Sequence, residues 1–134
     1  MVTVVLSYDT EEYQAPWADE ATKVWTDLLT KYNLRGCFCI VGEKARVLRD
    51  RNRQDIIDAL KEHEINYHSN LHSVHPTHAE YLNELSWDDG VRRCLMEETI
   101  GISDLWDIME RRPTAYCKPG SSWGPQVAYS MSIL

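Results

Sequence analysis

Strand-like and helix-like segments alternate along this chain, and this order limits the fold more than any other feature of the sequence. The strand-like segments are rich in β-branched, aromatic and cysteine side chains, and strands are expected at residues 2–8, 35–42, 64–67 and 114–117. Helical patterns are found at about 17–32, 43–50, 53–62, 87–99, 103–111 and 126–134. Strands that alternate with helices predict parallel βα units, and therefore an α/β fold.

Two of these segments carry specific expectations about the core. Residues 2–8 form an almost unbroken run of β-branched and aromatic side chains, which predicts a buried strand. In the first helical segment, the apolar side chains that recur at helical spacing are predicted to form the buried stripe, namely Val24, Trp25, Leu28 and Leu29.

Composition argues against several classes of function. The 134 residues suffice for one domain with a substantial core. The formal charge of −7, from 21 acidic and 14 basic residues, argues against a protein that binds nucleic-acid phosphates. No apolar run approaches the roughly 20 residues that span a bilayer, and the N-terminus has neither a basic region nor a cleavage site. We therefore expect a cytoplasmic protein without nucleic-acid or membrane partners, whose oligomeric state the sequence does not indicate.

The four cysteines do not have the spacing of a zinc knuckle. Cys37 and Cys39 are two residues apart in an expected strand, so they share a face without the geometry of a disulfide. Both are predicted to be buried thiols that act as small apolar side chains.

An acidic cluster follows the first expected strand directly. Asp9, Glu11 and Glu12 lie within four residues. Carboxylates crowded at a strand end repel one another unless a cation neutralises them, which favours a metal site. The alternative is the acidic first turn of a helix, where Asp and Glu interact favourably with the helix dipole.

A histidine pair follows the third expected strand. His68 and His72 can direct both imidazoles to one point if the backbone coils there, and neutral imidazole is the commonest ligand for a divalent transition metal. Two histidines on a solvated helix face are the alternative. Because the carboxyl ends of parallel strands meet at one edge of a sheet, the acids, this pair and the loop at 118–125 are expected to converge. This convergence favours the metal interpretation.

The order of these motifs resembles that of the polysaccharide deacetylases, also called NodB-homology domains or family 4 carbohydrate esterases. The segment HEINYHSNLH at 63–72 is similar to the family's HEIGxH[ST]xxH motif, and SYDTE at 7–11 is similar to its TFDD motif. GCFCIVG at 36–42 resembles the family's ATFFxxG strand, and CKPG at 117–120 resembles its RxP[GY] motif.

The resemblance spans nearly the whole chain and implies a distorted (β/α)7 barrel. The 134 residues would then be a single partial NodB-like deacetylase domain, truncated at the C-terminus, with about the first half of the barrel. Carried over by position, His68 and His72 are metal ligands and Asp9 is the general base. The acidic ligand is Glu11, with Thr10 as the alternative. The metal would be Zn²⁺, with Co²⁺ or Ni²⁺ also suited to such a site.

The resemblance implies a metal-dependent hydrolase that removes acetyl groups from an N- or O-acetylated sugar or polysaccharide. Asp9 would accept the proton of a metal-activated water. The residues expected to contact substrate lie on the loop after the last strand, namely Lys118, Pro119, Gly120 and Trp123. An amidohydrolase acting on non-peptide C–N bonds is the alternative with the same fold.

The sequence departs from the family pattern at two places. Cys117 stands where the third motif has an arginine, and no histidine follows His78 to serve as the general acid. These departures leave open a catalytically inactive carbohydrate-binding domain. They also predict little or no activity for the 134 residues alone.

Overall fold

The computed structural model describes residues 1–120 and 122–134, so Ser121, within the expected substrate loop, lies outside the described residues. The described elements are β1 (Ser7–Thr10), α1 (Trp17–Lys31), β2 (Cys37–Ile40), α2 (Gly42–Asp50), α3 (Gln54–Lys61), β3 (Glu64–Tyr67), α4 (His78–Leu82), α5 (Trp87–Met109) and α6 (Pro125–Ile133). The strands form one parallel sheet in the order β1-β2-β3, which confirms the α/β class. None of these described helices is long and apolar enough to cross a membrane.

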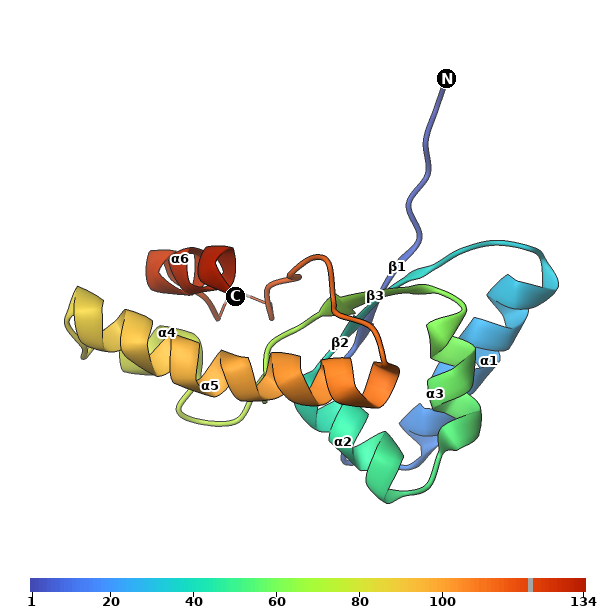
Figure 1. Ribbon diagram of the computed structural model, residues 1–134, viewed down its shortest axis with the longest axis horizontal. Helices are drawn as coiled ribbons and strands as arrows, with labels where there is room; N and C mark the ends of the chain where they lie inside the picture. Colours follow the sequence, from blue (N-terminus) through green and yellow to red (C-terminus); the bar gives the residue numbers. More distant parts are fainter. Residues whose placement is uncertain (121) are drawn as a thin grey trace.

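The sheet has one apolar face and one polar face, because side chains alternate across each strand. Tyr8, Phe38, Ile40, Ile65 and Tyr67 pack in the hydrophobic core with side chains from the surrounding helices. In Figure 1, α5 runs lengthwise below the strands, with α2 packed against it and α6 beside its N-terminal half. The alternate strand positions carry polar or small side chains, which are Ser7, Asp9, Cys37, Cys39, Glu64 and Asn66.

The described residues form an open sheet, and the expected barrel is not observed in them. Residues 114–117, expected as a fourth strand, contribute a single parallel bridge between Tyr116 and Tyr67. β1 begins at Ser7, and the preceding arm projects from the molecule (Figure 1) with its valines exposed. The prediction of a buried strand over 2–8 is therefore wrong. The β-branched composition keeps the arm extended, but strand pairing starts only where the Leu6 carbonyl accepts the Cys37 N–H.

α1 buries a different face from the one expected. Of the four apolar residues assigned to its stripe, Leu29 is buried, whereas Val24, Trp25 and Leu28 are exposed. Apart from Leu29, the buried positions of α1 are small or polar, namely Ala18, Asp19, Thr22 and Thr26. A carboxylate can occupy this face because cationic side chains near α2 neutralise it, and hydropathy alone does not reveal such pairing.

The two helices expected at 87–99 and 103–111 are one continuous helix, α5. Gly101 does not interrupt it but permits a close crossing. A Cβ at Gly101 would meet the Cα of Asn70 at 2.9 Å as well as the hydroxyl of Tyr67, and a Cβ at Gly42 would meet the Cα of Gly101 at 2.9 Å. The glycines therefore let α5 and α2 approach the end of β3.

Cys39 and Cys117 form a disulfide, with their Cα atoms 6.1 Å apart, so the prediction of a free thiol at Cys39 is wrong. Cys37 is a free, half-buried thiol, and Cys94 is free and buried. The two-residue spacing of Cys37 and Cys39 excludes a disulfide between them but says nothing of a partner far away in the sequence. The actual partner comes from the segment on the far side of β3.

Replacing Gly101 with alanine tests the close crossing of α5. In a helix interior this change usually stabilises by about 0.5–1 kcal/mol. Here we expect the free energy of unfolding in urea to fall by about 1–3 kcal/mol, because the added Cβ must displace the Asn70 backbone. Gly90→Ala in the same helix is the control, since its Cβ would meet the flexible end of Leu82. Equal effects of the two changes would contradict the proposed crossing.

Candidate metal centre

Three side chains converge beyond the carboxyl ends of β1 and β3. The Oε2 atom of Glu11 lies 2.8 Å from Nε2 of His72 and 3.3 Å from Nε2 of His68. The potential ligand atoms of all three residues lie within 4.8 Å of one another. Two imidazoles and one carboxylate give a donor set with a single negative charge, which suits a divalent transition metal.

A hydrogen bond to a backbone carbonyl orients the ring of His68. It is buried, and its Nδ1–H donates to the carbonyl of Cys117 at 2.8 Å. A carbonyl can only accept, so this bond assigns the proton to Nδ1 and leaves the Nε2 lone pair directed at Glu11. A metal-ligating histidine is usually oriented in this way, by a hydrogen bond from the ring nitrogen that does not face the metal.

His72 is half-buried, and its ring lies 5.1 Å from that of His68 between centroids. Burial is the main cause that lowers the pKa of His72, and the neighbouring His68 acts in the same direction, against the acids Glu11 and Asp9. The balance favours the neutral imidazole, which is the form that coordinates a metal.

The loop between the histidines has an unusual backbone that several elements hold in place. Ser69 and His72 both have positive φ, of 67° and 57°, a conformation that L-residues rarely adopt. The first amides of α2 donate to this loop, from Gly42 N–H to the Ser69 carbonyl at 3.0 Å and from Glu43 N–H to the Asn70 carbonyl at 2.9 Å. These bonds satisfy orphan donors of the helix N-terminus while fixing the loop.

A buried carboxylate supports the same loop from the α5 side. Glu98 is 2% exposed and accepts hydrogen bonds from the Tyr67 hydroxyl at 2.7 Å and the Asn70 N–H at 3.2 Å through one oxygen. Its other oxygen accepts from His78 Nε2 at 2.9 Å. Burial, followed by the Glu98 charge, raises the pKa of Tyr67 well above its ordinary value, so the hydroxyl remains a donor.

Glu11, the expected ligand, and its neighbours Thr10, the alternative, and Glu12 differ in what they contact. Glu11 reaches both histidines, whereas the Thr10 hydroxyl donates to the carbonyl of Tyr8 at 3.3 Å. Glu12 turns back on its own loop and accepts from the N–H groups of Gln14 and Ala15 at 2.6 and 3.0 Å. The contacts therefore support Glu11.

Asp9 is exposed and stands two residues before Glu11 on the polar side of β1. Both acids line a cavity of about 430 Å³ between β1 and α1, whose wall also includes Trp17 and Trp25. Asp9 is thus a solvent-exposed carboxylate that lines the same cavity as Glu11.

Only some residues of the loop expected to bind substrate lie beside the candidate ligands. Pro119 and Gly120 line a cavity of about 220 Å³ together with His72 and Thr77. Lys118 folds back onto the carbonyl of Gly120, and Trp123 is 48% exposed. The described lining of this cavity includes neither Lys118 nor Trp123.

Sequence reasoning missed the residues that hold the site together. Glu98 lies in the middle of a charged helix, and Asp19 and Lys44 belong to helices whose other charges are mostly exposed, with Arg51 directly after the second of them. The sequence around Lys44 carries no sign that this one side chain is buried. Only its position relative to the loop after β1 distinguishes it.

The sequence matches no family model and no curated protein. The fold, however, is similar to solved CE4 structures. A CE4 family pseudoenzyme from Bacillus anthracis matches with a TM-score of 0.66 and 18% identity over 96% of this chain and 39% of that one. The peptidoglycan deacetylase PdaC from Bacillus subtilis matches with a TM-score of 0.62 and 19% identity over 95% of this chain and 54% of that one.

A family 4 carbohydrate esterase from Streptomyces lividans, solved with acetate, matches with a TM-score of 0.65 and 15% identity over 97% of this chain and 57% of that one. The chain thus spans about two to three fifths of the length of the structures it resembles. At these identities the matches establish the fold, which is that of an N-terminal portion of the CE4 structures. The resemblance seen in the sequence motifs is confirmed at that level.

Glutamine substitutions at the two adjacent acids test which one binds metal. We expect Glu11→Gln to weaken the affinity for Zn²⁺ by at least about 10–100-fold, because it removes the carboxylate shared by the two histidines. Glu12→Gln is the matched control, since an amide oxygen can still accept from Gln14 and Ala15. Competition with a chromogenic chelator measures both affinities. A larger loss in Glu12→Gln would reassign the ligand.

Proposed function

We propose that this chain carries the metal centre of a hydrolase that removes acetyl groups from an N- or O-acetylated carbohydrate. The observation that carries the proposal is the convergence of Glu11, His68 and His72 on the CE4-like fold. Zn²⁺ in such a site would lower the pKa of a bound water and polarise the acetyl carbonyl. Co²⁺ and Ni²⁺ suit the same donor set.

The chain's own residues supply the remaining functions. Asp9 accepts the proton of the attacking water, since it is an exposed carboxylate beside Glu11. His68 keeps its Nε2 directed inward through the Cys117 carbonyl. Pro119 and Gly120 form a wall next to His72, where the sugar bearing the acetyl group would lie. Lys118 and Trp123 border this loop and are proposed to contact more distant parts of the substrate.

A second candidate function is a carbohydrate-binding domain without catalysis. In the described residues, the two histidines that follow the ligand pair are engaged elsewhere, since His75 pairs with Glu80 and His78 with Glu98, and the sequence has no histidine after His78. The third-motif position holds Cys117, whose sulfur is bonded to Cys39. One of the matched structures is a CE4 family pseudoenzyme, and another is its mutant with restored enzymatic activity.

Metal content of the purified chain tests the shared premise of both functions. We expect near-stoichiometric zinc in the wild type and its loss in the His68→Ala/His72→Ala double variant, because both imidazole ligands are removed. His75→Ala is the control, as His75 is exposed and paired with Glu80. Elemental analysis after dialysis gives the result. A folded wild-type chain without metal would refute the metal centre.

Acetate release separates hydrolysis from binding alone. With zinc bound and an N-acetylglucosamine oligomer as the probe, we expect at most slow release of acetate, because no acid assists the leaving group. Asp9→Asn should abolish that release while zinc affinity remains within about threefold, since Asp9 is not among the ligands. Oligomer binding without any acetate release would favour the non-catalytic domain.

A further inference from the structure

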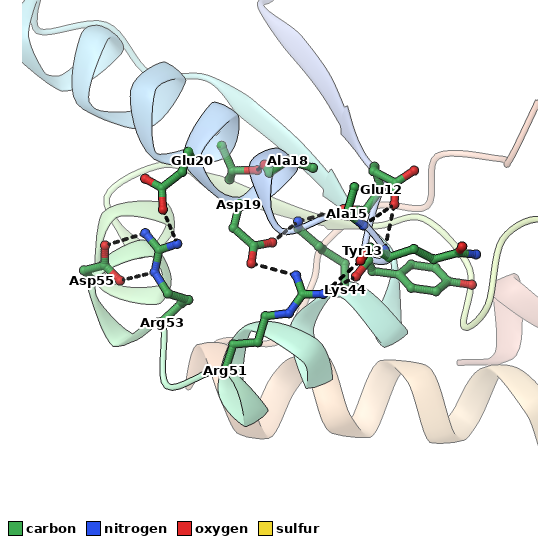
Figure 2. A network of polar contacts seen from close by, with 12 residues as sticks. Glu12, Tyr13, Ala15, Ala18, Asp19, Glu20, Lys44, Arg51, Arg53 and Asp55 are labelled. Carbon is green, nitrogen blue, oxygen red and sulfur yellow. Dashed lines mark hydrogen bonds and ion pairs between the residues drawn. The ribbon is translucent and has the colours of Figure 1, made fainter.

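A buried ion cluster lies beneath the loop that carries Glu11 (Figure 2). Lys44 of α2 is 1% exposed, and its Nζ donates to Oδ1 of Asp19 at 2.6 Å and to the backbone carbonyl of Glu12 at 2.7 Å. Arg51, which follows α2, donates to Oδ2 of Asp19 at 2.8 Å. Two cations thus share one carboxylate, and one of them already reaches the loop.

Arg51 extends this contact along the loop. Its guanidinium donates to the carbonyls of Tyr13 and Gln14 at 3.0 and 3.1 Å. Three successive carbonyls, of residues 12–14, are therefore held by two buried or half-buried cations. The Tyr13 hydroxyl in turn donates to the Leu71 carbonyl at 3.3 Å, which joins this loop to the one between the candidate histidine ligands.

A gain in folding stability does not by itself explain why these charges are buried. Burying a lysine charge carries a desolvation penalty, and buried pairs often contribute little more than apolar side chains of similar size. Burial lowers the pKa of Lys44 despite its partner. Burial would raise the pKa of Asp19, but the hydrogen bonds from Lys44 and Arg51 outweigh it and the pKa lies below its ordinary value. What the cluster provides is a fixed position for the carbonyls it contacts.

Glu11 is the ligand that needs such support. It belongs to no helix or strand, and its side chain is 45% exposed. His68, by contrast, is buried and fixed by backbone bonds. A flexible ligand must be ordered when the metal binds, and the conformational entropy lost then lowers affinity.

We infer that Lys44 and Arg51, joined through Asp19, are positioning residues for Glu11. By holding the carbonyls of residues 12–14, they keep the Glu11 carboxylate at the two histidines before any metal arrives. This inference rests on the metal centre proposed above. It assigns a role in the site to residues that contact neither metal nor substrate.

Two arginines two residues apart provide a matched test. Arg53 forms ion pairs with Glu20 at 2.5 Å and Asp55 at 2.9 Å, both exposed, and bonds none of the loop carbonyls (Figure 2). Arg51→Gln and Arg53→Gln remove the same charge and the same side-chain volume. Removing a positive charge near the site would by itself strengthen binding of a cation. Any weakening must therefore come from the lost positioning of the loop.

The affinity for Zn²⁺, the free energy of unfolding without metal, and amide exchange of the metal-free chain are measured for wild type and both variants. We expect Arg51→Gln to weaken zinc affinity by about 10–100-fold, as for other residues that orient metal ligands. The amides of Gln14 and Ala15, which bond the Glu12 side chain, should exchange at least tenfold faster. Arg53→Gln should change zinc affinity and these exchange rates by less than about threefold.

Arg51→Lys is a third variant. Lysine keeps the positive charge but lacks the forked guanidinium group that reaches both Asp19 and the loop. We expect it to restore the unfolding free energy more than the zinc affinity. Equal zinc affinities for Arg51→Gln and Arg53→Gln, with zinc bound tightly by the wild type, would overturn the positioning role alone. A folded wild type that binds no zinc would overturn the metal centre and this inference with it.

Discussion

The parallel register of the three strands is the constraint on which the candidate site depends. Thr10, Ile40 and Tyr67 are aligned at the carboxyl ends of β1, β2 and β3, so the loops that follow leave the sheet at one level. The segment with Glu11 and the segment with His68 lie two strands apart, yet this alignment brings their side chains within hydrogen-bond distance. A shift of register by one residue would move Asp9 to the apolar face among the helices.

The loops that carry the ligands are held by buried charges rather than by regular structure. Glu98 supports the histidine loop from α5, and Asp19 with Lys44 and Arg51 supports the acidic loop from α1 and α2. Each carboxylate is buried, and each has donors for both of its oxygens. Such groups are retained in a core at a cost in desolvation. Glu98 contacts the histidine loop, and the cations paired with Asp19 contact the acidic loop, so each buried carboxylate is linked to one of the two loops with candidate ligands.

Local sequence patterns predicted the strand after which the histidines lie, most of the helices, and the three candidate ligands whose side chains the structure brings together. They did not predict α4. They could not locate features that depend on a distant partner. Apolar composition places Val2 and Trp25 in the core, but Val2 projects into solvent and Trp25 keeps about half of its surface exposed beside Tyr8. The helix predicted to end at residue 99 continues through Gly101, which permits a close crossing with Asn70. The burial of Lys44 and the Cys39–Cys117 disulfide could not be predicted for the same reason, since each depends on a contact with a residue far away in the sequence.

In the third motif, the structure shows separate contacts for the backbone and for the side chain of Cys117, which the sequence could not distinguish. Cys117 acts on His68 through its backbone carbonyl, a bond that any residue at this position could make. Its side chain is bonded to Cys39 and offers no charge to Asp9, which no described side chain contacts by a hydrogen bond or an ion pair. A cysteine at this position therefore keeps the backbone bond that orients His68, but its side chain supplies no positive charge near Asp9, the proposed base. In the proposed site, the orientation of His68 and the charge beside Asp9 depend on different atoms of one residue, so this position can keep the first without supplying the second.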